Sequence, residues 1–565
     1  MKHWTAFIAI VLISAGAIIW AEHKKVNAQA SPEAVMYFIG DSERELTRLP
    51  IAMTKISDEE EIRIGDDMAS RYTQWRRQGQ ESPEDREVRQ YVEEVGNRVA
   101  SHAGRKLPYK FHYIPDPYFV NAFALPGGHV FIGQGMINLM DSEDELANVL
   151  GHEVEHIDLN HCVERVQIEA RMRHFNLGVV GALASIPIQV FEAGYSKEQE
   201  LAADREGTRL AVAGKYSPEG AVRMFENFEK FEPGQQRKPG TPQEEIATVA
   251  LSSLTEYFRS HPPSAMRADQ IKRLIAEQNW PVTKETNLKI AYLRYKVLAQ
   301  EAYAQQKYPQ AIQYAKRSLA LQSRQSELVR LTGQSQFMLG DFTGSTQSFK
   351  SLLTEFSSAQ PEDQRSFADA LAAEHSKSSV AEFDTFVTQF IPKSDVMAMT
   401  LKVDRAGLHM LSGEPRAADS LEQELTAVDK EYTADLLARL AWWYYRAGNP
   451  QRSSALFEEA VQLRPQESPR FRAGRAWPEI EQRHYDSALT FYGGDAVGKE
   501  ANAIRAVGEW LAKNHEGALR EYENLANDSS WSNRHWVQGN YSPTVVSALD
   551  EMKQERERRL AARKK

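Results

Sequence analysis

The pattern of apolar and polar positions predicts two helices followed by two short strands in the first part of the chain. DEEEIRIGDDMASRYTQW from Asp58 and DREVRQYVEEVGNRVASHAG from Asp85 carry apolar or small residues three and four positions apart, which is typical of amphipathic helices. From Tyr109, YKFHYIP alternates as a strand does, and GGHVFIGQG from Gly127 is a second candidate strand between glycines. These elements favour a mainly helical, α+β domain with a small sheet.

A third helix is predicted to begin at Ser142. In DSEDELANVLGHEVEHIDLNH this serine stands three residues before Glu145, which is the spacing of a capping box. Leu150 and Ile157 belong to the apolar stripe of the same helix. Two further helical segments follow, YSKEQELAADREGTRLAVAG and FRSHPPSAMRADQIKRLIAEQ. We expect the first domain to occupy residues 31–280, with the linker NWPVTKETN at its end.

Beyond Leu288 the pattern changes to pairs of helices with a weak internal repeat. Ala311 and Ser345 occupy matching places one tetratricopeptide period apart. The clearest unit, LAWWYYRAGNPQRSSALFEEAVQLRP, carries the expected residue types at Leu440, Ala441, Tyr444, Ser453, Phe457, Ala460 and Pro465. We predict an α-solenoid of TPR-like helix pairs over 288–530, with an irregular helical bundle as the alternative. Residues 531–565 are expected to form a charged C-terminal tail, whose last part, DEMKQERERRLAARKK, is expected to be a solvated helix or a frayed tail.

The N-terminus predicts an export signal or a membrane anchor over residues 1–30. An apolar run extends over Trp4–Ala21, and Ala28-Gln29-Ala30 is a small-x-small site that a signal peptidase can cleave. The run is also about long enough to span a bilayer. Lys24 and Lys25 follow it and weigh against export, because positive flanks prefer the cytoplasm.

Length, charge and cysteine content narrow the function classes. A chain of 565 residues is too long for one core, so two to four domains are expected. The net charge of −10 gives no basic footprint for nucleic acid. Cys162 is the single cysteine, which excludes an intrachain disulfide. Next to the histidines discussed below it can be a metal ligand, but a buried small apolar residue is the expected role.

Three of the 15 histidines gather in the third predicted helix. His152, Glu153 and His156 spell H-E-x-x-H, and positions i and i+4 of a helix share one face. Both imidazoles can then reach one Zn²⁺, while Glu153 can take a proton from a nearby water. His161 lies five residues beyond His156, a poor spacing for the same metal face, and is expected to end the helix.

A third metal ligand must come from elsewhere in the chain. EQELAADREG places Glu200 and Asp204 four residues apart on one predicted helix face. Glu200 can bind the ion, while Asp204 can accept the free ring N–H of a zinc-bound histidine. Glu198 and Glu206 are competitors, but neither has an aspartate four residues later.

At this point the chain resembles a known family. VNAFALPGGHVFIGQGMI, ELANVLGHEVEHIDLNH, EQELAADREG and SHPPSAMRADQI occur in the order found in the zinc metallopeptidases related to the CaaX prenyl protease and HtpX. With an export signal and helical repeats added, the chain is similar to the BepA-like, periplasmic members that act in outer-membrane protein assembly. The resemblance covers about Ile64 to Leu274 and implies a zinc endopeptidase with one ion per chain.

The resemblance also implies roles for residues that the pattern alone does not single out. Asn121 to Gly128, including Ala122 and Gly127, would form an edge strand on which an extended substrate pairs. His261 matches a residue that can close over the zinc as an inhibitory extra ligand, and otherwise simply begins a helix. Arg267 would steady the oxyanion of the reaction, and otherwise is an ion-pairing surface residue.

The chain differs from HtpX-like relatives in the region between the two predicted helices that carry the metal ligands. HtpX-like relatives have hydrophobic spans there, whereas this chain has only Leu177–Phe191, which is short for a membrane span and contains Pro187. A buried or lid-like helical segment is expected instead. This difference favours a soluble domain of the BepA-like kind.

These observations lead to one principal hypothesis and two alternatives. The principal one is a periplasmic zinc endopeptidase whose repeats bind misfolded or unassembled envelope proteins, or a partner protein on their concave face. The first alternative is a chaperone or binding module with a latched or vestigial zinc site. The second keeps the peptidase but tethers it to the membrane through residues 4–21.

Overall fold

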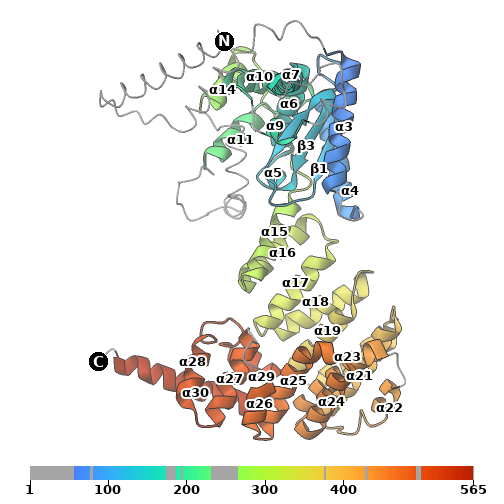
Figure 1. Cartoon of the computed structure of the whole chain (residues 1–565), viewed down its shortest axis with the longest axis vertical. Coiled ribbons are helices and arrows are strands. Elements are labelled where there is room, and N and C mark those ends of the chain that lie inside the picture. Colours follow the sequence, from blue (N-terminus) through green and yellow to red (C-terminus); the bar gives the residue numbers. More distant parts are fainter. Residues whose placement is uncertain are drawn as a thin grey trace. The chain divides into compact units, whose positions relative to one another are not determined.

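The computed structural model describes residues 56–76, 81–172, 186–192, 195–230, 265–374, 377–426, 430–491 and 498–563. The chain divides into two compact units, Met1–Ala291 and Tyr292–Lys565 (Figure 1). The predicted N-terminal signal or anchor, His261 and most of the Leu177–Phe191 segment lie outside the described residues. Within the described ranges, no helix is both long and apolar enough to cross a membrane.

A three-stranded sheet lies beside the first two described helices of unit 1. The helices are α3 (Asp58–Arg76) and α4 (Pro83–Ala100), and the strands are β1 (Lys110–Ile114), β2 (Ala122–Leu125) and β3 (His129–Gly133). The strand order is β1-β3-β2, with β1 parallel and β2 antiparallel to the central β3. The two predicted strands are confirmed as β1 and β3, and β2 lies at an edge of the sheet.

The edge strand expected over Asn121 to Gly128 is shorter in the structure, because a turn between β2 and β3 takes up its last residues. Strand β2 ends at Leu125, and Gly127 and Gly128 belong to a 3-10 turn with φ of 75° and 102°. A Cβ on Gly127 would lie 2.7 Å from the Ile62 Cα, so the turn packs directly against α3. These glycines therefore supply a left-handed turn rather than strand edge.

Seven further helices lie in the described part of unit 1, and two of them, α6 and α10, carry the predicted metal ligands. They are α5 (Gln134–Asn138), α6 (Glu143–Asp158), α7 (His161–Met172), α9 (Gln189–Glu192), α10 (Lys197–Ala213), α11 (Glu219–Lys230) and α14 (Ala265–Glu277). The predicted start of α6 is confirmed, because the Ser142 hydroxyl accepts a hydrogen bond from the Glu145 N–H. Unit 1 continues past 280, since the Thr286 N–H donates to Asp144 and Asn287 forms a bridge with Ser142.

Unit 2 is built from successive antiparallel helix pairs, as the repeat predicts. Small residues let the two helices of a pair approach closely. Ser345 donates to the Gly333 carbonyl and Ser453 to the Ala441 carbonyl, each across twelve residues, and both serines are fully buried. The helices are α15 (Tyr292–Ala304), α16 (Tyr308–Leu321), α17 (Ser326–Met338), α18 (Phe342–Glu355), α19 (Pro361–Ala373), α20 (Lys377–Gln389), α21 (Asp395–Leu411), α22 (Leu421–Thr426), α23 (Lys430–Arg446), α24 (Pro450–Leu463), α25 (Ser468–Glu481), α26 (Tyr485–Phe491), α27 (Lys499–Leu511) and α28 (His515–Glu523).

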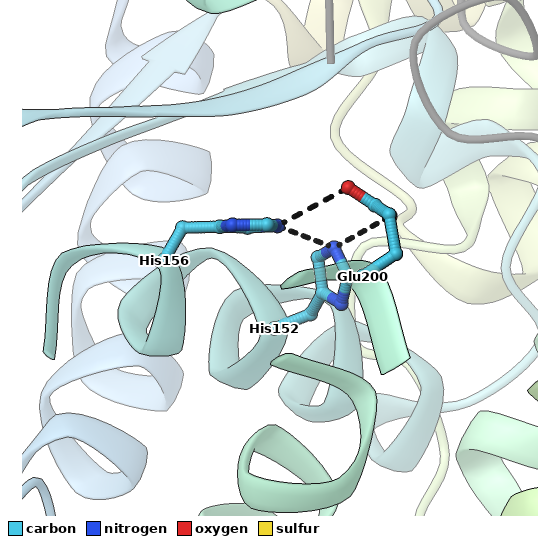
Figure 2. Close-up of side chains that lie close together, drawn as sticks. All are labelled: His152, His156 and Glu200. Atoms are coloured by element: carbon cyan, nitrogen blue, oxygen red, sulfur yellow. Dashed lines mark hydrogen bonds and ion pairs between the residues drawn. The ribbon is translucent and has the colours of Figure 1, made fainter. Parts of the chain in front are cut away.

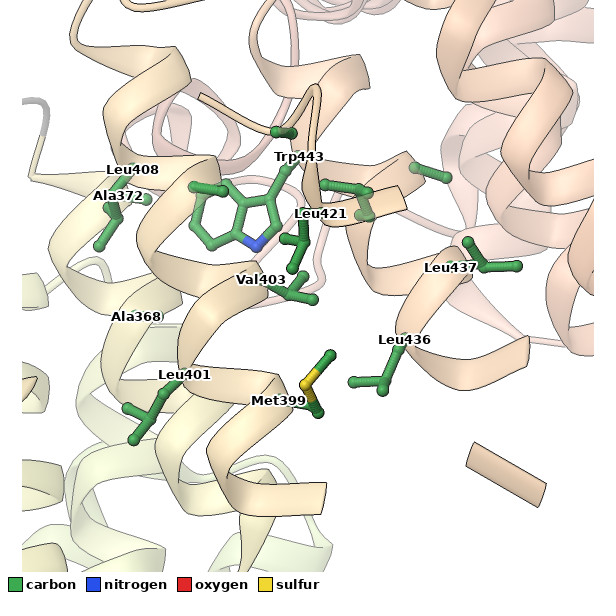
Figure 3. Packing of buried hydrophobic residues seen from close by; sticks show 14 of the residues in the cluster. Ala368, Ala372, Met399, Leu401, Val403, Leu408, Leu421, Leu436, Leu437 and Trp443 are labelled. Carbon is green, nitrogen blue, oxygen red and sulfur yellow. The ribbon is translucent and has the colours of Figure 1, made fainter. Parts of the chain in front are cut away.

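Trp443 stands in the middle of the larger apolar core of unit 2 (Figure 3). Its ring packs against Gly407, where an added Cβ would come within 2.1 Å of the indole. The indole N–H donates to Asp404, and the Arg439 guanidinium lies 4.8 Å from the ring centroid. The polar edge of this large buried ring is therefore hydrogen-bonded, as burial requires.

The prediction that residues 531–565 form a charged tail is wrong for the first half of this segment. Helices α29 (Arg534–Asn540) and α30 (Pro543–Arg563) bury Trp531, Trp536 and Met552 in the second core of unit 2. The reason is the spacing of apolar residues before the charged run, which gives the segment one packed face. The second half of α30 is largely exposed and charged, as expected.

This C-terminal segment also joins parts of unit 2 that are distant in sequence. Ser530 and Asn533 donate to the Met338 and Leu339 carbonyls at the end of α17. Arg446, at the end of α23, donates to the Gly539 carbonyl at 2.6 Å. In a simple solenoid each repeat contacts only its neighbours, so these bonds close the chain of helices upon itself.

Candidate metal centre

Helices α6 and α10 bring two imidazoles and one carboxylate to a single point (Figure 2). The Nε2 atoms of His152 and His156 lie 3.0 Å apart. The two oxygens of Glu200 lie 3.5 Å from these nitrogens, one from each ring. All three side chains are buried. The structure thus brings together the three residues that the sequence proposed as metal ligands.

Two glycines allow α10 to cross α6 closely enough for this meeting. A Cβ on Gly151 of α6 would lie 2.6 Å from the Gly207 carbonyl oxygen, and a Cβ on Gly207 of α10 would lie 2.6 Å from the His152 nitrogen. The backbones therefore touch at His152 itself, because no side chain separates them there. Nothing in the apolar periodicity marked this contact.

Asp204 fixes the orientation of the first imidazole. Its carboxylate lies 2.9 Å from His152 Nδ1, on the side of the ring away from Glu200. Arg267 of α14 holds the same carboxylate with two bonds, from Nε at 2.6 Å and from Nη2 at 2.7 Å. Burial alone would raise the pKa of Asp204, but Arg267 and His152 lower it below its usual value.

Arg267 therefore contacts Asp204 and also lies 3.3 Å from Glu200. Its guanidinium also lies 4.7 Å from the centroid of the Phe225 ring. The surface ion pair considered for Arg267 is wrong, because Arg267 is buried. It contacts the carboxylates of both Asp204 and Glu200, and the oxyanion role implied by the family resemblance stays a prediction.

The pKa values of the two imidazoles are shifted in opposite directions. Burial favours a neutral His152, but the bond to Asp204 and the charge of Glu200 outweigh it and raise its pKa to about 10. Burial lowers the pKa of His156 to about 4, and the neighbouring His152 adds to that effect. The carboxylates that favour a proton on His152 favour any other cation at the same point.

Glu153 follows the first ligand histidine in α6 and is 1% exposed. Burial raises the pKa of its carboxyl to about 7, with the charge of Glu200 adding to the rise and His152 opposing it. A carboxyl group with a pKa near neutrality can both accept and release a proton at physiological pH.

The donor set fits a zinc ion. Tetrahedral zinc with bonds of about 2.0–2.1 Å places neighbouring ligand atoms about 3.3 Å apart. Here the two Nε2 atoms lie 3.0 Å apart, and each lies 3.5 Å from a different oxygen of Glu200. Two nitrogens and one carboxylate oxygen are also the ligand types that catalytic zinc sites use, with a further position left for water or substrate.

Two residues that contact the centre were missed or misjudged from the sequence. Tyr195 stacks on the His156 ring, with centroids 3.9 Å apart, and its hydroxyl lies 3.3 Å from the Cys162 sulfur. The Nδ1 atom of His161 lies 3.0 Å from Nδ1 of His156. The expectation that His161 only ends the helix is therefore too simple, since it directly contacts a predicted ligand. Cys162 is buried and is not among the three clustered ligand residues.

Comparison with known proteins places this centre in a family. The model of peptidase family M48 matches residues 86–275. Three relatives share this region. The mitochondrial metalloendopeptidase OMA1 of Schizosaccharomyces pombe is 30% identical over 208 residues, which are 35% of this chain and 55% of that protein. The beta-barrel assembly-enhancing protease of Escherichia coli K12 is 28% identical over 159 residues, 25% of this chain and 32% of the relative.

The metalloprotease LoiP of the same Escherichia coli strain is 26% identical over 189 residues, 32% of this chain and 65% of the relative. The chain thus spans less than two thirds of the length of each of these relatives. The matched region contains His152, Glu153, His156, Glu200, Asp204 and Arg267. Residues 86–275 are therefore similar to peptidase family M48, in agreement with the resemblance noted in the sequence.

Proposed function

We propose that the chain is a zinc-dependent endopeptidase in which His152, His156 and Glu200 hold the ion. The observation that carries the proposal is the set of three buried ligand atoms, all within 4.8 Å of one another, directly beside Glu153. Zinc bound there would act as a Lewis acid on the scissile carbonyl and would make water easier to deprotonate.

The protein's own groups then divide the remaining work. The Glu153 carboxylate accepts a proton from the attacking water and delivers it to the amine that leaves. Asp204 accepts the Nδ1–H of His152, which keeps the Nε2 lone pair directed at the ligand position. Arg267 keeps Asp204 ionised and in place.

Substrate class and location follow as parts of the same proposal. One relative is named for the assembly of β-barrels, and the N-terminal apolar run suits export or anchoring. We infer an enzyme of the periplasm that cleaves misfolded or unassembled envelope proteins bound by the repeats. Strand β2, at the edge of the sheet, is the element on which an extended substrate would pair.

The test uses the full-length protein and an unfolded substrate such as casein. Zinc-loaded protein is expected to cleave casein, a zinc chelator to stop the cleavage, and added Zn²⁺ to restore it. Cleavage that persists in excess chelator, or its absence in protein shown to be zinc-loaded, would contradict the proposal.

A binding or chaperone role for the repeats is the second candidate. The observation that favours this role is that the repeats form a separate compact unit, Tyr292–Lys565. If this role dominates, protein without zinc should still suppress the aggregation of unfolded envelope proteins as well as the zinc-loaded form does. Loss of that suppression on zinc removal would argue against it.

A further inference from the structure

A break between α6 and α7 brings the His161 ring into contact with His156, one of the proposed metal ligands. Helix α6 ends at Asp158, Asn160 has φ of 63°, and α7 begins at His161. Asparagine tolerates this left-handed conformation better than most residues. On a continuous helix, residues five apart point in different directions. The turn at Asn160 instead brings the two rings to a centroid distance of 5.1 Å.

The contact lies on the side of His156 away from the ligand position. Its Nε2 faces His152 and Glu200 at 3.0 and 3.5 Å, whereas its Nδ1 faces Nδ1 of His161 at 3.0 Å. His161 is therefore placed to act on His156 and not as another ligand of the same ion. Both rings are buried, with His156 fully so and His161 7% exposed.

Only one arrangement of protons lets His156 bind a metal through Nε2. A neutral imidazole has one protonated nitrogen and one with a lone pair. If Nε2 supplies its lone pair to the ion, Nδ1 carries the proton and donates it to His161. Nδ1 of His161 must then be the acceptor, so His161 is neutral and protonated on Nε2.

We propose that His161 is the positioning residue of His156. It accepts a hydrogen bond from the Nδ1–H of His156, as Asp204 does from the Nδ1–H of His152. The inference rests on the metal site of the proposed function. Tyr195 stacks on His156 with an interplanar angle of 17° and restrains the plane of the ring, while the bond to His161 fixes the direction of the ring within that plane. The two ligand histidines are thus oriented by different acceptors, a carboxylate and a neutral imidazole.

The test compares His161→Asn with His161→Leu in the full-length protein. The Asn amide oxygen can accept the bond from His156, whereas Leu fills space without accepting. Chelator competition should show zinc affinity about 10–100-fold weaker for His161→Leu, with the Asn variant closer to wild type. Thermal unfolding of the metal-free proteins measures any purely structural effect.

Equal zinc affinity of the Leu variant and wild type would overturn the inference, even if the Leu variant unfolded at a lower temperature. A wild-type protein that binds no zinc would instead refute the proposed function. If the Leu variant does not fold, ¹⁵N NMR of histidine-labelled, zinc-loaded wild type decides. His161 protonated on Nε2 alone is expected, and a proton on its Nδ1 would exclude the role.

Discussion

At the scale of single residues, the centre brings three buried carboxylates close to two imidazoles. Glu153, Glu200 and Asp204 are all buried, and Arg267 is the guanidinium that contacts two of them. Buried carboxylates are costly unless they are paired or bind a metal. A divalent cation between His152 and Glu200 would add a favourable charge to this acidic centre.

Glu153→Gln separates metal binding from catalysis. Glutamine has the same size but cannot take a proton, so casein cleavage should fall about 100–10,000-fold, the usual contribution of a general base. Zinc content should stay at the wild-type level, because Glu153 is not among the three clustered ligand residues. Glu198→Gln is the matched control, since Glu198 is exposed on α10. Undiminished cleavage by Glu153→Gln would refute the role given to Glu153.

At the scale of elements, the metal centre depends on how α6 and α10 cross. Gly151 and Gly207 allow backbone contact at the crossing, and the capping box at Ser196 sets where α10 begins. Glu200 and Asp204 then follow on the face that meets α6. The position of the third ligand is therefore a property of the helix pair as well as of the EQELAADREG sequence.

Gly207→Ala should disturb this crossing. The added Cβ would lie 2.6 Å from the His152 nitrogen, so the helices must separate, at a cost of about 1–3 kcal/mol in the free energy of unfolding. Zinc affinity should fall as well, because Glu200 moves with α10.

Gly214→Ala, at the end of the same helix, is the control, since its Cβ would find its nearest atom at 3.3 Å. Urea unfolding of the metal-free proteins and chelator competition are the measurements. If both variants matched wild type in unfolding free energy and in zinc affinity, the close crossing of α6 and α10 would have no part in forming the site.

The same elements show what the sequence can and cannot predict. The start of α6 at Ser142 and the shared face of His152 and His156 follow from local rules, capping and helical spacing. The role of His161 does not, because its contact requires the helix to break at Asn160. The contact of Gly151 with Gly207 also escapes periodicity, which describes side-chain faces and not backbone approach.

At the scale of the whole molecule, each unit has its own organisation. The first holds the metal centre, and the second is a helical-repeat structure closed by its C-terminal segment. The repeat predicts the helix pairs correctly because small buried residues such as Ser345 and Ser453 recur at the required spacing. The closure was not predicted, because contacts across almost two hundred residues leave no periodic trace in the sequence.

Trp536→Ala tests this closure. Trp536 is 7% exposed, and removing so large a buried side chain should cost about 3–5 kcal/mol. Hydrogen exchange should quicken around Met338–Phe342 and the end of α19, as well as in α29 and α30. Ile391→Ala, at an 84% exposed side chain, should leave exchange unchanged. An effect confined to α28–α30 would indicate an open solenoid instead.

The central claim is that one ion is held jointly by α6 and α10, and zinc titration of the full-length Glu200→Gln variant tests it most directly. Wild type should bind about one zinc per chain with a tetrahedral three-residue site. The variant should lose most of that affinity, while Glu198→Gln keeps it. Wild-type affinity in Glu200→Gln would contradict the account, because the ion would then not depend on the carboxylate from the second helix.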